Sequence, residues 1–220
     1  MFDITVSKVL KSKWETIAIA SIQANILVKP SCNELKELLN KACIDFALNH
    51  SVEDISKLKP ISDTRKAYKA FGKDPARYRV SSEALLRRVV KDKGIYNVNN
   101  IVDINNLVSI SSFFSICAFD VSKLYPPIEF TLGEKDDEYF GIGRGILNIE
   151  NLAVFSDKIG KFGSPTSDSE RVKITDETKQ INMNIVSFSG EKDLQIHLDK
   201  LKNLLLRFLD AKNVEMRIFK

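Results

Sequence analysis

The segment from Arg65 to Lys93 concentrates positive charge. It holds ten basic and three acidic residues and therefore carries a net charge of +7, whereas the whole chain carries +4. Three aromatic residues, Tyr68, Phe71 and Tyr78, lie among these cations. Basic side chains neutralise phosphates and aromatic rings stack on bases, so the segment suits a nucleic-acid partner. The same residues also fit an amphipathic helix with its rings in the core and its cations in water, and both interpretations stay open.

Nucleophilic or metal chemistry has little support in the cysteines and histidines. Cys117 has no histidine or cation next to it in the sequence to lower its pKa, and its apolar neighbours favour a small buried side chain. The two histidines, His50 and His197, have no partner at the spacing of metal ligands. We therefore expect no metal site and no cofactor.

Two loops could contact anions. Gly141, Gly143 and Gly145 surround Arg144, but the apolar run that follows predicts a strand rather than the helix of a phosphate loop, which favours a β-turn. The segment from Ser164 to Arg171 is rich in hydroxyl groups and ends in an arginine. It could bind sugar or phosphate oxygens, and it also has the composition of an ordinary solvated loop.

Hydrophobic periodicity predicts the elements that must position these residues. Helices are expected at residues 31–49, 62–71, 83–93, 104–112 and 191–211, the first with Ser31 and Glu34 as a capping box, and Ser51 followed by Asp54 starts a further short helix. Strands are expected at residues 2–6, 16–28, 128–132, 153–156, 180–186 and 214–218, and residues 120–187 form a strand-rich half.

This pattern predicts an α+β fold of two layers, with a mostly antiparallel or mixed sheet and an amino-terminal helical region. We divide the 220 residues into an amino-terminal α/β region, 1–72, packed on a main domain, 73–220, the two forming one compact unit. No apolar run approaches the roughly 18 residues of a membrane span or resembles a signal peptide, and three cysteines make no disulfide framework. These features predict a cytoplasmic protein without a membrane partner.

The order of several motifs resembles the B3/B4 module of the phenylalanyl-tRNA synthetase beta subunit. The segment Asp-Ile-Asn-Asn-Leu-Val from Asp103 is followed, after eight residues, by Ile-Cys-Ala-Phe-Asp ending at Asp120. A glycine-rich hairpin, a strand ending at Asp157 and the segment Thr-Asp-Glu-Thr at 175–178 follow in the order found in that module. Upstream, the run from Asp74 to Arg88 resembles the stand-alone version of the module. The resemblance covers about residues 74–188, and we expect it to extend to the whole chain.

The resemblance implies a proofreading site, because in the synthetase this module hydrolyses tyrosine from the phenylalanine tRNA. The resemblance carries its pocket onto Asn105, Asn106, Cys117, Gly163 and Asn184. Asn106 and Gly163 match the family pattern, whereas Asn105, Cys117 and Asn184 replace a threonine, a histidine and a glutamate. Asparagine cannot take up a proton, and cysteine is a poor substitute for imidazole as a hydrogen-bonding group. The editing mechanism is therefore not expected to transfer intact.

The resemblance implies a tRNA-binding module without the ordinary editing chemistry. Its expected phosphate contacts are basic residues near the module's start and in the hydroxyl-rich loop, namely Arg77, Arg79, Arg87, Arg88, Lys91 and Arg171. Two other functions stay open. One is a free-standing hydrolase of mischarged aminoacyl-tRNA, and the other is a protein that binds a small amino-acid ligand in the same pocket.

Overall fold

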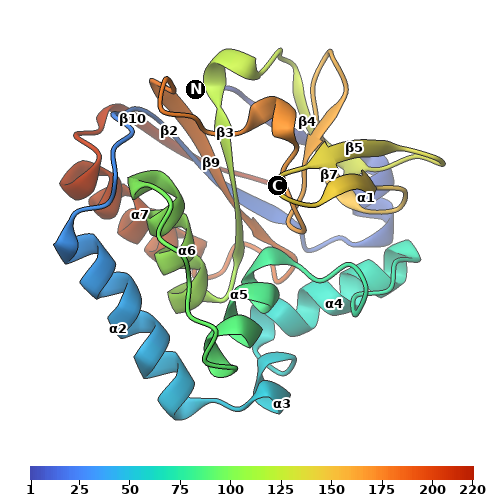
Figure 1. Cartoon of the computed structure of the whole chain (residues 1–220). Helices are drawn as coiled ribbons and strands as arrows, with labels where there is room; N and C mark the ends of the chain where they lie inside the picture. Colours follow the sequence, from blue (N-terminus) through green and yellow to red (C-terminus); the bar gives the residue numbers. More distant parts are fainter.

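The computed structural model describes all 220 residues and contains two four-stranded sheets and a hairpin (Figure 1). The strands are β1 (Ile4–Val6), β2 (Ala18–Asn25), β3 (Ser115–Asp120), β4 (Ile128–Leu132), β5 (Glu138–Gly141), β6 (Gly145–Asn148), β7 (Ala153–Ser156), β8 (Lys161–Gly163), β9 (Gln180–Ser187) and β10 (Lys212–Phe219). The helices are α1 (Lys8–Lys13), α2 (Asn33–Asn49), α3 (Val52–Ile55), α4 (Lys59–Phe71), α5 (Ser81–Val90), α6 (Asn100–Ser112) and α7 (Leu194–Phe208). None of them is long and apolar enough to cross a bilayer.

The central sheet has the order β10-β2-β9-β3 and is antiparallel throughout. Alternate residues of β2 serve opposite faces, because side chains of a strand alternate in direction. Ala20 and Ile22 belong to the core on the helical side, whereas Ile19 belongs to the core on the other side. The strand is buried on both faces, and five of its eight residues are apolar.

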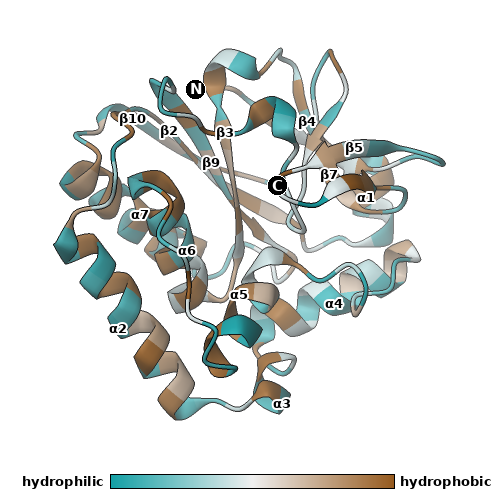
Figure 2. Cartoon of the chain, in the orientation of Figure 1, coloured by the Kyte–Doolittle hydropathy of each residue, from teal (hydrophilic) through white to brown (hydrophobic).

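The helical layer covers one face of the central sheet. Helices α2, α5, α6 and α7 share one hydrophobic core with strands β2, β3 and β9 (Figure 1). On α7, Leu194, Leu198, Leu201 and Leu205 recur at intervals of three or four residues and are buried, while most of the intervening residues are hydrophilic (Figure 2). The predicted helix at 191–211 thus forms for the expected reason, with shorter ends.

The second sheet, β1-β4-β7-β8, lies against the opposite face. It pairs β1 with β4 in parallel and its other strands antiparallel, so the α+β class with mixed and antiparallel sheets is confirmed. A second hydrophobic core, with Phe119, Phe130, Phe155 and Phe162, joins the two sheets. The two expected layers are the helices and the central sheet. The second sheet packs on the face of the central sheet that the helices leave free.

The structure corrects several predicted helix ends. Ser31 does not cap α2, since Cys32 is the N-cap and the Ser31 hydroxyl donates 2.6 Å to Asp103 instead. Helix α4 begins at Lys59 rather than Ser62, and α6 begins at Asn100, where Asn99 caps it. Helix α5 ends at Val90, before the predicted end at Lys93. The short helix expected from Ser51 is α3, and there Ser51 and Asp54 form a capping box.

The amino-terminal region is interleaved with the rest of the chain. Strand β2 lies between β10 and β9 in the central sheet, and both hydrophobic cores contain residues from either side of residue 72. The amino terminus is paired with Glu215 of β10. Regions 1–72 and 73–220 therefore share one packed interior.

Candidate functional site

Three of the five predicted pocket residues meet between the two sheets. Cys117 on β3 stands opposite Asn184 on β9 in the strand register, and both are buried. Gly163, at the end of β8, reaches the same region through Asp168, whose Oδ1 would lie 3.0 Å from a Cβ atom placed on that glycine. We call Cys117, Gly163, Asp168 and Asn184 the inter-sheet site.

Asp168 is the residue of this site that the pocket assignment from sequence missed. Its Oδ2 accepts a hydrogen bond of 3.1 Å from the backbone N–H of Ala118, and its carboxylate lies next to the Cys117 thiol. The residue as a whole is half-buried, but its carboxyl group is enclosed, and Oδ1 has no partner. Burial raises the pKa of Asp168 to about 7, and the hydrogen bonds oppose that rise.

The Cys117 thiol is held in its neutral form. Burial, and then the adjacent Asp168 carboxylate, raises the pKa of Cys117 well above its ordinary value. A nucleophilic cysteine needs the opposite shift, because the thiolate is the reactive species. The expected reading of Cys117 as a small buried side chain agrees with this environment.

Gly163 allows a close approach that any larger residue would block. A Cβ atom there would lie 2.5 Å from Cε1 and 2.7 Å from Cζ of Phe119. The Phe119 ring also packs edge-on against Phe155 and Phe162. Phe119 therefore occupies the space in front of Gly163 and closes this side of the inter-sheet site.

The loop that carries Asp168 is anchored from three directions. The Tyr139 hydroxyl of β5 donates to Ser164 Oγ at 3.0 Å, and the Tyr68 hydroxyl of α4 lies 3.1 Å from Thr166 Oγ1. The backbone N–H of Ser81, at the start of α5, donates 2.7 Å to Pro165 O. The signal for this site in the sequence was the hydroxyl-rich composition of residues 164–171, whose hydroxyls here hold the loop.

A row of buried polar side chains crosses the central sheet beside Cys117. Asn184 Nδ2 donates 2.7 Å to Asn182 Oδ1, and Asn182 Nδ2 donates 3.1 Å to Ser21 Oγ. Asn184 Oδ1 has no partner in the protein. The inter-sheet site thus has two buried acceptor oxygens without donors, one on Asn184 and one on Asp168, and buried acceptors of this kind are costly unless a ligand or water satisfies them.

Asn105 and Asn106 lie elsewhere. Both are on α6, which packs with α2, α5 and α7 over the helical face of the central sheet, whereas Cys117 belongs to the core on the opposite face. Asn105 Oδ1 is buried without a partner, and both residues are half-buried. The structure therefore does not bring the asparagine pair to the inter-sheet site.

The basic segment is organised around a single buried carboxylate. Glu83 on α5 is fully buried and accepts from Arg65 Nη1 at 3.0 Å and from Arg87 Nε at 2.8 Å. Arg79 Nε lies 3.8 Å from the same carboxylate. These three arginines carry two more positive charges than Glu83 neutralises, and we call them with Glu83 the arginine cluster.

The other basic residues predicted to contact phosphates differ in whether their side chains are free of partners within the protein. Arg77 and Lys91 are exposed and form no ion pair. Arg88 is turned to its own helix end, where Nε donates 2.6 Å to Gly94 O, and its guanidinium lies over Tyr96. Arg171 forms two hydrogen bonds with Asp157, of 3.0 and 2.9 Å, and also binds Lys123 O, so it fixes a loop rather than facing outward.

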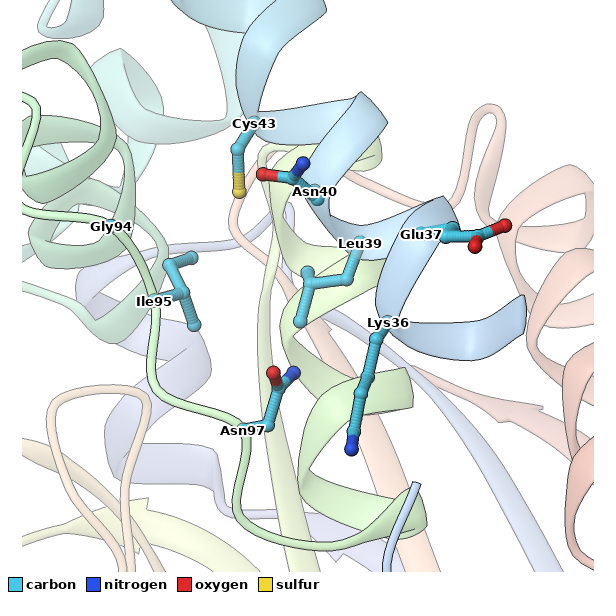
Figure 3. A pocket seen from close by; sticks show the side chains of 8 residues that line it. All are labelled: Lys36, Glu37, Leu39, Asn40, Cys43, Gly94, Ile95 and Asn97. Carbon is cyan, nitrogen blue, oxygen red and sulfur yellow. The ribbon is translucent and has the colours of Figure 1, made fainter. Parts of the chain in front are cut away.

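Surface hollows on the helical face contain none of the predicted site residues. One of about 290 Å³ lies between α2 and the segment after α5, where Cys43, Asn40 and Leu39 face Ile95 and Asn97 (Figure 3). The thiol of Cys43 has a raised pKa because it is partly buried. No group of three histidine, cysteine or acidic residues is arranged to hold a metal ion.

Comparison with solved structures supports the fold. The chain is similar to an N-terminal fragment of the phenylalanyl-tRNA synthetase beta subunit from Pyrococcus horikoshii, with a TM-score of 0.50 and 15% sequence identity. The match covers 99% of this chain and 50% of that one, so the chain spans about half of its structural neighbour. No curated protein matches the sequence significantly.

The sequence also matches a known domain family over most of its length. The family described as the B3/4 domain matches residues 63–215, which include α5, α6, all of the inter-sheet site and the Glu83 carboxylate with its three arginines. The match begins within α4 and ends within β10, so it includes strands of both sheets. This chain belongs to the B3/4 domain family.

Proposed function

We propose that this chain is a tRNA-binding B3/4 protein that lacks the ordinary editing chemistry of the synthetase module. The observation that carries the proposal is the arginine cluster, in which three guanidinium groups share one buried carboxylate and leave a surplus of two positive charges. Membership of the B3/4 family and a fold shared with a phenylalanyl-tRNA synthetase fragment favour tRNA as the polyanion that this cluster binds.

The geometry of the arginine cluster suits phosphate contacts. The Arg79 side chain is 44% exposed, those of Arg65 and Arg87 are each 25% exposed, and the neighbouring Arg77 is exposed without an ion pair. Hydrogen bonds to Glu83 hold two of the guanidinium groups in place while leaving further N–H donors free. Donors that are already positioned lose less conformational entropy on binding a phosphate.

The inter-sheet site supports the absence of ordinary editing. At the two positions where the family pattern has histidine and glutamate, this chain has a neutral buried thiol and an amide that cannot take up a proton. Phe119 lies against Gly163 and fills the approach to the site. Neither residue could take a proton from a water molecule for ester hydrolysis.

One observation favours the second candidate function, a free-standing aminoacyl-tRNA hydrolase. Asp168 has an unpartnered buried oxygen and a pKa raised to about 7, so it could act as a general base near neutral pH. The unpartnered oxygens of Asp168 and Asn184 would equally accept donors from a bound amino acid. These alternatives require the Phe119 ring to move.

Fluorescence anisotropy with labelled total tRNA tests the proposed function. Binding should be measured at about 50 and about 200 mM salt, because affinity carried by phosphate contacts falls steeply between these concentrations. The double variant R77Q/R79Q should weaken binding about tenfold and reduce the salt slope by roughly one per lost contact. Absence of binding at low salt would overturn the proposal.

A matched control separates the arginine cluster from general positive charge. Lys179 and Lys212 are exposed, form no ion pair and lie where β9 and β10 meet the end of β2 at Asn25, the opposite end of the sheet from α5. K179Q/K212Q should leave binding within about twofold of the wild type. Equal losses in the two double variants would show that Arg79 of the arginine cluster and its neighbour Arg77 act only through general positive charge, which would contradict binding at the cluster.

Deacylation assays decide between the two candidate functions. tRNA charged with a panel of amino acids is incubated with the chain, and a synthetase with editing activity serves as positive control. We expect no acceleration over spontaneous hydrolysis. Acceleration that D168N abolishes would establish the hydrolase instead.

A further inference from the structure

The helical face contains a groove that the tRNA-binding proposal does not use. It lies between α2, α6 and α7, on the layer that covers the central sheet away from the inter-sheet site (Figure 1). It is open to solvent and has a volume of about 600 Å³, which falls within the usual range for small-molecule sites. A second hollow of about 440 Å³ continues along α7 and shares Lys200, Leu204 and Arg207 with the groove.

The floor of the groove is apolar. Leu107 and Ile110 of α6 and Leu204 of α7 form its base, with Leu38 and Ala42 of α2 along one side. Phe113 also lines the groove and has a left-handed conformation, with φ of 66°, that bulky residues rarely adopt. The fold therefore keeps this aromatic ring in the lining despite the backbone strain.

The rim of the groove is positively charged. Lys200 Nζ donates 2.8 Å to the Ser111 hydroxyl and forms no ion pair, and partial burial lowers the pKa of Lys200. Lys41 on the facing helix also has no ion pair, whereas Arg207 is paired with Glu34. Asp45 is the acidic residue of the rim. Lys200 thus offers an ammonium group without a counter-ion next to an apolar floor.

We propose that this groove binds a small amphipathic carboxylate. Its hydrocarbon or aryl body would cover the floor formed by Leu107, Ile110 and Leu204, and its carboxylate would accept a hydrogen bond from Lys200. A charge-assisted bond to a partly desolvated ammonium is stronger than one between neutral groups, so an anion is preferred over an alcohol of the same shape. An amine of that shape would be repelled.

Calorimetric titration of the intact chain tests this proposal with defined probes. Octanoate, decanoate and 4-phenylbutyrate represent aliphatic and aryl bodies, and 1-octanol and octylamine are the neutral and cationic controls. We expect at least one carboxylate to bind in the micromolar to low millimolar range, at least tenfold tighter than the alcohol. The amide NMR signals of Ser111 and Lys200 should shift on titration.

Two variants with matched controls locate the binding site. K200Q should weaken carboxylate binding about tenfold, whereas K202Q, a change on the same helix at a residue that does not line the groove, should not weaken it. A42F should block the groove sterically, and A47F, at an exposed position of α2 outside the groove, should not. Circular dichroism verifies that each variant is folded, and K200Q suffices if A42F does not fold.

Three results would overturn the proposal. The first is no binding of any of the three carboxylates at 10 mM, a concentration about tenfold above the weakest expected Kd. The second is binding that K200Q and K202Q reduce equally. The third is light scattering that shows a dimer in the wild type and a monomer in A42F, because the groove would then be covered by a second copy of the chain.

Discussion

The carboxyl group of Asp168 lies next to the thiol of Cys117, and both groups are enclosed between the two sheets. The contact joins the loop after β8 to the middle of β3, and the neighbouring Ala118 N–H donates 3.1 Å to the same carboxylate. An enclosed carboxyl group with few donors is more stable when protonated than when charged. Its ionisation should therefore influence the stability of the whole fold.

Stability should fall as the pH rises through the range in which Asp168 ionises. The pKa of Asp168 is about 7 in the folded chain and 3.8 in the reference state, so the folded state binds more protons between these values. The free energy of unfolding should drop by several kcal/mol, of order 4, between about pH 4 and pH 7 because of this group. Urea unfolding at pH 5 and pH 8 measures the effect.

D168N is the control for this pH dependence. His197 has a lowered pKa through burial and opposes Asp168 in part of the same range, and Asp63 and Asp120 have lowered pKa values that act below about pH 4. These contributions cancel in the difference between wild type and D168N, which should isolate Asp168. A difference that does not change between pH 5 and pH 8 would contradict the assigned ionisation.

E83Q should destabilise the chain through charge repulsion in the arginine cluster. Arg65 and Arg87 bind the Glu83 carboxylate at 3.0 and 2.8 Å, and its removal leaves neighbouring guanidinium groups without a counter-charge. We expect a loss of about 3 kcal/mol in the free energy of unfolding, measured with urea at neutral pH. E37Q, at an exposed glutamate of α2 without an ion pair, should change it by less than about 0.5 kcal/mol.

G163A should be destabilising because of the Phe119 ring rather than because of backbone conformation. The new Cβ atom would lie 2.5 Å from Cε1 of Phe119, which demands movement in a packed core, and we expect a cost of about 2 kcal/mol or more. The cost should be at least about 1 kcal/mol smaller in an F119L background. A double-mutant cycle from thermal or urea unfolding checks the coupling, and additive effects would show that other contacts are responsible.

A fragment comprising residues 73–220 should not fold alone. Removing residues 1–72 takes away β2, and β9 and β10 then lose the strand between them. The fragment should give a disordered amide NMR spectrum, and adding residues 1–72 as a separate polypeptide should restore dispersed signals. A cooperative unfolding transition of the fragment by itself would instead establish residues 73–220 as an independent domain.

The sequence alone determined most of the secondary structure and the fold class. The leucines from Leu194 to Leu205 recur with helical spacing, and the β-branched stretch from Thr16 to Val28 predicts the strand found at Ala18–Asn25, so local periodicity sufficed. The motif order around Asp103–Asp120 was sufficient for the family, which the match over residues 63–215 confirms. Such patterns show whether a helix or strand is buried on one face or on both, and the residues of that segment alone carry this information.

Only the tertiary structure decided which polar groups meet. Ser31 binds Asp103 rather than capping α2, and Arg65 reaches Glu83 from another helix, because buried polar groups take partners that folding brings close. Asp168 lies in a loop whose composition is that of an ordinary solvated loop. In the folded chain, hydrogen bonds with Tyr68 and Tyr139 hold this loop and Ala118 donates to the Asp168 carboxylate. Burial and pairing depend on contacts between residues far apart in the sequence. Such contacts raise the pKa of Asp168, and they determine which cations of the basic segment remain free to bind a partner.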